Sequence, residues 1–146
     1  MKSRGTVYSF SYNNFDDCTS GFRQSFGGLH KIYGIEPDMV VFGKALGNGY
    51  AITAVIGRRE IMEAAQSTFS SSTFWTERIG PAAALKTLEV MEKEKSWEKI
   101  TQTGRDIMAG WKVLAGKYGL SITISGLPAL AGFAFDSPRE IWLAKR

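Results

Sequence analysis

Lys44 is the residue whose type and surroundings most clearly point to chemistry. It follows the apolar run 40–42 (Val-Val-Phe), and glycines stand at positions 43, 47 and 49. Such an apolar run predicts a buried strand, and a lysine at the end of a buried strand is costly unless it has a partner or a task. Partial desolvation lowers the pKa of a lysine and makes its amine a usable nucleophile. Such an amine is what a Schiff base with an aldehyde cofactor requires.

An acidic pair, Asp16-Asp17, follows a weaker strand pattern at residues 6–15, where aromatic and polar residues roughly alternate. An aspartate at a strand end, near a lysine on a parallel strand, suits a pyridine cofactor. The carboxylate keeps the ring nitrogen protonated through a charge-assisted hydrogen bond. The protonated ring then stabilises a carbanion, and the lysine amine can carry the proton. The alternative is an acidic turn beside a solvated lysine, since aspartates are common in turns.

The elements expected around these residues are those of an α/β protein. Residues 39–43 and 51–57 predict a hairpin around Lys44, residues 16–36 and 68–77 predict loops, and residues 58–67 predict a short helix. Pro81 opens a helix that runs to about Lys95. A second helix is expected over 97–118, ending at Gly119, and two strands are expected at 121–125 and 132–135. Apolar residues at helical spacing give the second helix its expected buried face: Ile100, Ile107, Met108, Trp111, Leu114 and Tyr118.

Composition excludes several classes of function. The 146 residues suffice for one modest domain, and 44% hydrophobic with 22% charged residues is ordinary for a soluble globular protein. The net charge of +4 is scattered, which argues against nucleic-acid binding. No apolar window is long enough for a membrane span.

The single cysteine and the single histidine also limit the function. Cys18 excludes an internal disulfide and fits a reducing cytosol. The first residues show no signal peptide, so a cytoplasmic location is expected. His30 and one distant cysteine cannot build a metal site, and we expect His30 to be a surface or loop residue without a metal or catalytic role.

Several motifs, in the same order, resemble the class III aminotransferases, which are pyridoxal-phosphate enzymes of fold type I. They are 16–23 (Asp-Asp-Cys-Thr-Ser-Gly-Phe-Arg), 27–28 (Gly-Gly), 33–38 (Tyr-Gly-Ile-Glu-Pro-Asp) and 42–50 (Phe-Gly-Lys-Ala-Leu-Gly-Asn-Gly-Tyr). The resemblance covers roughly residues 15–136 and is greatest to the glutamate-1-semialdehyde 2,1-aminomutase branch. Several motifs in order are far more specific than any single one.

The resemblance implies roles for individual residues. Lys44 matches the Schiff-base lysine, Asp16 matches the aspartate that pairs with the pyridine nitrogen, and Asp17 stands where the family usually has glutamate. Residues 72–81 resemble a loop whose threonine reaches the cofactor phosphate of the neighbouring subunit, and a helix N-terminus suits a phosphate. Counting back from Pro81 without a gap selects Thr76, with Thr73 as the alternative. A Ser/Thr-rich capping loop is the third interpretation.

The resemblance also implies a fold and an activity. The expected fold is part of a fold type I large domain, with a mixed, mainly parallel sheet and flanking helices. Residues 1–96 would belong to that pyridoxal-phosphate-binding domain, 97–118 would form the interdomain helix, and 119–146 would begin the small C-terminal domain. The expected activity is pyridoxal 5′-phosphate-dependent amino-group transfer, of the aminotransferase or aminomutase type, on a small amino acid or amino-aldehyde in a homodimer.

Members of the family are much longer than this chain. Their main phosphate-binding loop and the aromatic residue that stacks on the ring lie upstream of all the residues here. The chain is therefore expected to be incomplete. Two alternatives stay open: a truncated, non-catalytic fragment, and a generic small α/β binding domain with a structural Lys44.

Overall fold

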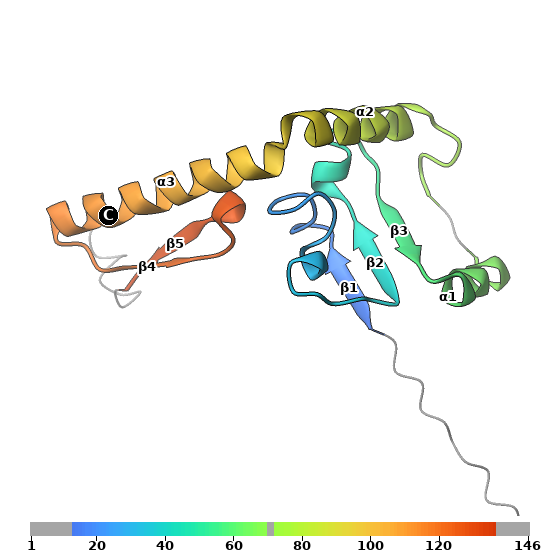
Figure 1. Ribbon diagram of the computed structural model, residues 1–146, viewed down its shortest axis with the longest axis horizontal. Helices are drawn as coiled ribbons and strands as arrows, with labels where there is room; N and C mark the ends of the chain where they lie inside the picture. The colour runs from blue at the N-terminus through green and yellow to red at the C-terminus, as the bar shows by residue number, and fades with distance from the viewer. Residues whose placement is uncertain (1–12, 70–71, 137–146) are drawn as a thin grey trace, which may run out of the picture.

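The computed structural model describes residues 13–69 and 72–136. Its strands and helices are, in chain order, β1 (Asn14–Asp17), β2 (Met39–Phe42), β3 (Ala54–Gly57), α1 (Arg59–Glu63), α2 (Ile79–Glu94), α3 (Ser96–Tyr118), β4 (Ile122–Ser125) and β5 (Gly132–Phe135). Short 3-10 helices are η1 (Leu29–Lys31), η2 (Lys44–Leu46), η3 (Ala64–Ser67) and η4 (Pro128–Leu130). Figure 1 shows the sheet β1–β2–β3 beside α2, with the long helix α3 leading away to the hairpin β4–β5.

The three-stranded sheet is mixed and has β2 at its centre. β1 runs parallel to β2, with Asp17 opposite Phe42, and β3 runs antiparallel to β2, with Ala54 opposite Phe42. The α/β class, the parallel neighbour and the hairpin that follows Lys44 are therefore confirmed. Residues 6–12 of the first predicted strand lie outside the described residues, and β1 begins at Asn14.

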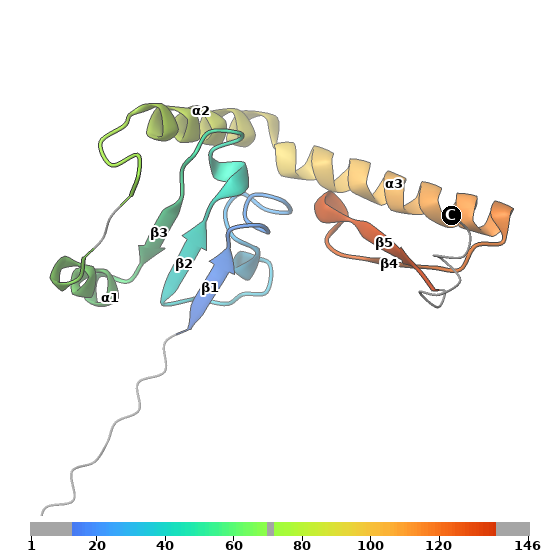
Figure 2. The same cartoon turned by 180° about the vertical axis from the view of Figure 1, so that it is seen from behind.

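The core lies on one face of this sheet. Directly paired residues of parallel strands point to the same face, so Asp17 of β1 shares its face with Phe42 of β2. Helix α2 adds residues at helical spacing to this core, namely Ala84, Leu88 and Met91, and Figure 2 shows it lying across the carboxyl ends of β1 and β2. The buried cluster and the partly buried residues around it are Phe22, Val40, Phe42, Ala45, Leu46, Ala84, Phe15, Phe26, Ile52, Ala54, Leu88 and Met91.

Helix α3 follows α2 almost without a break. Lys95 adopts a left-handed conformation (φ 48°) between the two helices, and α3 ends at Gly119 in the same region (φ 61°), as predicted. The expected apolar face of α3 is only partly right, because Ile107, Leu114 and Tyr118 are exposed. The buried positions of α3 are the small residues Gly104 and Ala115. They form a narrow stripe on the helix, against which the following segment packs.

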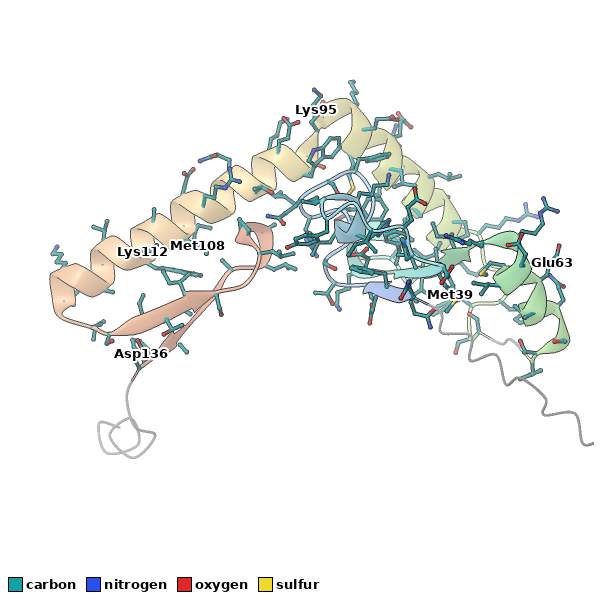
Figure 3. All side chains as sticks on the ribbon, turned by 60° about the horizontal axis from the view of Figure 1, so that its bottom comes forward. Met39, Glu63, Lys95, Met108, Lys112 and Asp136 are labelled. Carbon is teal, nitrogen blue, oxygen red and sulfur yellow. The ribbon has the colours of Figure 1, made fainter. Side chains whose placement is uncertain are left out.

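The hairpin β4–β5 packs against this stripe of α3. The Trp111 ring lies 5.0 Å from the Phe133 ring, measured between ring centroids. Asp136, labelled in Figure 3, follows β5, and its carboxylate accepts hydrogen bonds from Ser121 (3.0 Å) and Thr123 (2.6 Å). These bonds join the two ends of the hairpin. Within residues 13–69 and 72–136, no helix is long and apolar enough to cross a membrane.

Candidate functional site

Lys44 lies directly beyond the carboxyl end of β2, in a strained turn. Its φ of 40° is left-handed, a region that side chains other than glycine rarely adopt. The preceding Gly43 packs against Cys18, because a Cβ at position 43 would lie 2.6 Å from the Cys18 sulfur. Ala45 and Leu46 turn into the core, whereas the Lys44 side chain turns outward and is exposed. The expectation that Lys44 is partly desolvated is therefore wrong for this chain.

Thr19, in the loop that follows β1, is the polar partner of Lys44. The Lys44 amine donates a hydrogen bond to the Thr19 hydroxyl, and the Arg23 Nε donates to the Thr19 carbonyl at 3.4 Å. Thr19 was not among the functional residues predicted from the sequence. The signal that could have found it is topological, because residues that follow the carboxyl ends of adjacent parallel strands meet at one edge of the sheet.

Asp16 and Asp17 point to opposite faces of the sheet and have different environments. Asp16 is exposed, lies opposite Val41, and accepts a hydrogen bond from the Cys18 N–H at 2.9 Å. Asp17 is 0% exposed. The structure thus brings Asp16 and Lys44 to the same edge of two neighbouring parallel strands, and it places Asp17 in the interior.

The buried Asp17 carboxylate has three hydrogen-bond donors. They are the Ser20 hydroxyl at 2.7 Å, the Leu29 N–H at 3.0 Å and His30 Nδ1 at 2.8 Å. Burial alone would raise the pKa of Asp17, but the hydrogen bonds from Ser20, His30 and Leu29, with attraction from the His30 ring, outweigh it. They hold that pKa below its ordinary value of 3.8.

His30 is not a surface residue, contrary to expectation. It is buried in η1, with 9% of its surface exposed, and its ring meets the edge of Phe15. Its partner Asp17 is 13 residues away in sequence. Sequence spacing alone carried no signal for this pairing.

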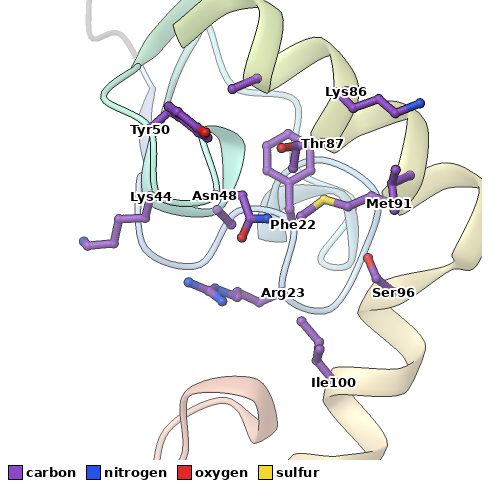
Figure 4. A pocket seen from close by; sticks show the side chains of 15 residues that line it. Phe22, Arg23, Lys44, Asn48, Tyr50, Lys86, Thr87, Met91, Ser96 and Ile100 are labelled. Atoms are coloured by element: carbon purple, nitrogen blue, oxygen red, sulfur yellow. The ribbon is translucent and has the colours of Figure 1, made fainter. Parts of the chain in front are cut away.

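Two hollows border Lys44. One, of about 730 Å³, is lined by Phe22, Arg23, Asn48, Tyr50 and the α2–α3 junction, and Figure 4 shows Lys44 and Arg23 at its open side. The other, of about 600 Å³, lies between Tyr50 and the segment before α2. Both are open, so a molecule that reacts with the Lys44 amine could approach from either side.

Thr73 and Thr76 stand apart from this arrangement. Both are exposed in the loop before α2 and, like Asp16, line neither of the hollows at Lys44, whereas Ser72, Phe74 and Glu77 of the same loop do. The Glu77 carboxylate accepts hydrogen bonds from the Ile79 N–H and from the Gly80 N–H (3.1 Å) at the start of α2. A side chain of the same loop therefore already binds part of this helix N-terminus.

Comparisons with known proteins identify the family to which this chain belongs. The family model "Aminotransferase class-III" matches residues 15–144. The solved structure of the FumI protein of Sphingopyxis sp. MTA144, in a PLP form, superposes with a TM-score of 0.80 at 29% identity, covering 85% of this chain and 30% of that one. The described residues therefore form part of a fold type I architecture.

Two curated relatives extend this comparison. The 3-aminobutyryl-CoA aminotransferase of Cloacimonas acidaminovorans is 38% identical over 122 residues, which are 83% of this chain and 30% of the relative. The glutamate-1-semialdehyde 2,1-aminomutase of Natranaerobius thermophilus is 33% identical over 124 residues, 83% of this chain and 29% of the relative. The chain belongs to the class III aminotransferase family. It spans about 30% of the length of the curated relatives it matches.

Proposed function

We propose that Lys44 is the amine that binds pyridoxal 5′-phosphate covalently, in amino-group transfer of the aminotransferase or aminomutase type. One observation carries the proposal: the exposed Lys44 and Asp16 lie at the carboxyl edge of adjacent parallel strands. Ligands of α/β sheets bind at this edge. The membership of the chain in the class III family supports the choice of cofactor.

The residues present fit such a cofactor. The Lys44 amine faces open space and would form the covalent link, and the exposed Asp16 carboxylate would keep a ring nitrogen protonated. When bound, the cofactor supplies an electron sink for the carbanion formed next to the substrate nitrogen. Lys44 would also take up the proton released at the substrate carbon that bears the nitrogen, since a lysine amine can accept a proton and return it. Thr19 would hold that amine at the strand end.

Substrate, assembly and location follow as parts of the same proposal. The substrate class is a small amino acid or amino-aldehyde, in keeping with the glutamate-1-semialdehyde named in one relative. The other relative is named for a coenzyme A thioester, 3-aminobutyryl-CoA. Residues 1–96 would belong to the large domain, 97–118 would connect it to the small domain, and 119–146 would begin the latter. Thr76, or else Thr73, would meet the cofactor phosphate of a second copy in a homodimer. The single Cys18 supports a cytoplasmic location.

Covalent trapping tests the proposal. The chain is mixed with pyridoxal 5′-phosphate, reduced with borohydride and digested, and the labelled peptide is identified by mass spectrometry. We expect the label on Lys44, and we expect Lys44→Ala to lose it together with the visible imine absorbance. Lys86→Ala is the matched control, because Lys86 lines the same hollow but pairs with Glu89 at 2.7 Å.

The alternatives predict different outcomes. Equal labelling of wild type and Lys44→Ala, or a label on another lysine, would show a generic α/β binding domain with a structural Lys44. A label on Lys44 without amino transfer to any tested keto acid would show a chain that binds the cofactor but does not turn over. A label on Lys44 with turnover would establish the activity for this chain.

A further inference from the structure

Asp17 and His30 form a buried, hydrogen-bonded pair that the proposed chemistry does not use. The Asp17 carboxylate is fully buried and the His30 side chain is 11% exposed, and the carboxylate oxygen and the ring nitrogen lie 2.8 Å apart. An ionised carboxylate only accepts hydrogen bonds, so Nδ1 is the ring nitrogen that carries the proton toward Asp17. A buried charge is retained at a cost unless each of its lone pairs is satisfied. Here the Ser20 hydroxyl and the Leu29 N–H complete the set.

The pair closes the 18–28 loop, which we define as the residues between β1 and η1. Ser20 lies near the start of this loop, and Leu29 and His30 follow its end, so Asp17 binds both ends at once. Gly28 packs directly on the pair, because a Cβ there would lie 2.1 Å from His30 Nδ1 and 2.2 Å from Asp17 Oδ2. Two backbone bonds close the loop internally, from Gly21 to Asp17 (2.8 Å) and from Phe22 to Gly27 (2.7 Å).

The loop that is closed in this way carries the partner of Lys44. Thr19 stands one residue before Ser20 and accepts the hydrogen bond of the Lys44 amine. Cys18, the first residue of the loop, packs on Gly43 at the base of the lysine turn. Asp17 therefore helps to position two contacts of the lysine turn. These are the hydrogen bond between Lys44 and Thr19, and the packing of Gly43 against Cys18.

We propose that Asp17 and His30 are positioning residues, which hold the 18–28 loop so that Thr19 orients the amine of Lys44. The pair touches neither Lys44 nor a cofactor, and it acts through the loop. This inference rests on the proposed role of Lys44. It predicts that the reactivity of Lys44 depends on a hydrogen-bond donor at position 30, beyond any effect of that donor on global stability.

Three variants of the full chain separate positioning from stability. His30→Leu removes the donor and keeps an apolar side chain of moderate size in the buried site. His30→Gln keeps an N–H donor and removes the ring. Asp38→Asn is the matched control, because Asp38 is also a bonded carboxylate of the same sheet, at the opposite end of β2 from Lys44. It accepts from the Asn13 N–H at 2.9 Å and pairs with Arg58 at 3.3 Å.

The readout is the rate of borohydride trapping of pyridoxal 5′-phosphate on Lys44, divided by the folded fraction of each variant. We expect His30→Leu to lower this rate about tenfold, because a misplaced reactive group loses orientation. We expect His30→Gln and Asp38→Asn to remain within about twofold of wild type, since both leave the oriented amine in place. Equal rates in His30→Leu and wild type would overturn the inference, as would an equal loss in Asp38→Asn.

Backbone amide exchange gives an independent measurement. The Gly21 and Phe22 N–H groups are hydrogen-bonded within the loop. We expect them to exchange faster in His30→Leu and at the wild-type rate in His30→Gln, and unchanged exchange in His30→Leu would overturn the inference.

If wild type itself is not trapped at Lys44, the proposed function fails, and the exchange rates still decide whether the pair holds the loop. If His30→Leu does not fold, Ser20→Ala, which removes another donor to Asp17, takes its place in both measurements.

Discussion

The loop that carries Thr19, the partner of Lys44, and the loop that carries Thr73 and Thr76 are built in different ways. The 18–28 loop is held to its own sheet by Asp17, buries Phe22, and contacts α3 through Phe26 and Trp97, whose rings lie 5.6 Å apart. The segment 68–78, of which residues 70 and 71 lie outside the described part, exposes Phe69 (93%), Phe74 (53%) and Trp75 (70%). Its anchor is Glu77, which binds the start of α2.

This difference bears on where each loop can act. The contacts that orient Thr19 come from within one chain, so the 18–28 loop can serve Lys44 of the same chain. The exposed aromatic side chains of segment 68–78 offer apolar surface to another molecule. That arrangement agrees with the proposal that Thr76 or Thr73 acts on the site of a second copy.

The largest effect is expected at the anchor of the 18–28 loop. Asp17→Ala leaves buried donors on Ser20, Leu29 and His30 without a partner, and we expect it to lower the free energy of unfolding by about 3 kcal/mol. Glu77→Ala removes a helix cap near the surface and should cost about 1 kcal/mol. Urea denaturation of both variants measures the two losses in the free energy of unfolding. Equal losses would show that the two loops are anchored alike.

A smaller loss is expected from Gly28→Ala. Its added methyl group would overlap both Asp17 and His30, and overpacking of this kind costs about 2 kcal/mol. Gly110→Ala on α3 is the control, because a Cβ there has no atom within 4 Å. We expect that control to gain about 0.5 kcal/mol from helix propensity. Thermal unfolding should show a lower melting temperature for Gly28→Ala and a higher one for Gly110→Ala. An unchanged melting temperature in Gly28→Ala would contradict the close packing of Gly28 on Asp17 and His30.

The free energy of unfolding is expected to depend on pH in part because the Asp17 carboxylate stabilises the fold only while it is ionised. Its pKa in the folded chain is below 3.8, so its ionised form stabilises the fold at pH values above the unfolded pKa. That contribution is lost as the pH falls through the folded pKa. Subtracting the profile of Asp17→Asn from that of wild type should therefore leave a difference that shrinks below about pH 4. A difference that grows as the pH falls would contradict the assignment.

The smallest effect on stability is expected in segment 68–78. Trp75→Ser removes a side chain that is 70% exposed, so the free energy of unfolding should change by less than about 0.5 kcal/mol. If this segment meets a second copy, the same substitution should weaken self-association. Sedimentation velocity over a range of concentrations measures it. A large loss of stability with unchanged association would show that segment 68–78 stabilises its own chain and does not contact a second copy.

Much of the local structure could be predicted from the sequence. The apolar run at β2 predicted a strand, Pro81 marked the start of α2 within two residues, and Gly119 marked the end of α3. Each signal is local, since it depends on side-chain periodicity or on the dihedral preferences of one residue. The expected buried face of α3 was less accurate, because helical periodicity does not say how wide a stripe the packed partner covers.

The sequence by itself determined that a lysine follows an apolar strand, that an acidic pair follows another strand pattern, and that the motifs lie in the order of one family. Only the tertiary structure decided which aspartate is buried, that His30 is its partner and that Lys44 is exposed. A strand places successive side chains on opposite faces, but the sequence does not say which face the rest of the chain covers. Here the 18–28 loop and η1 cover Asp17, and Asp16 is left exposed at the same end of the sheet as Lys44.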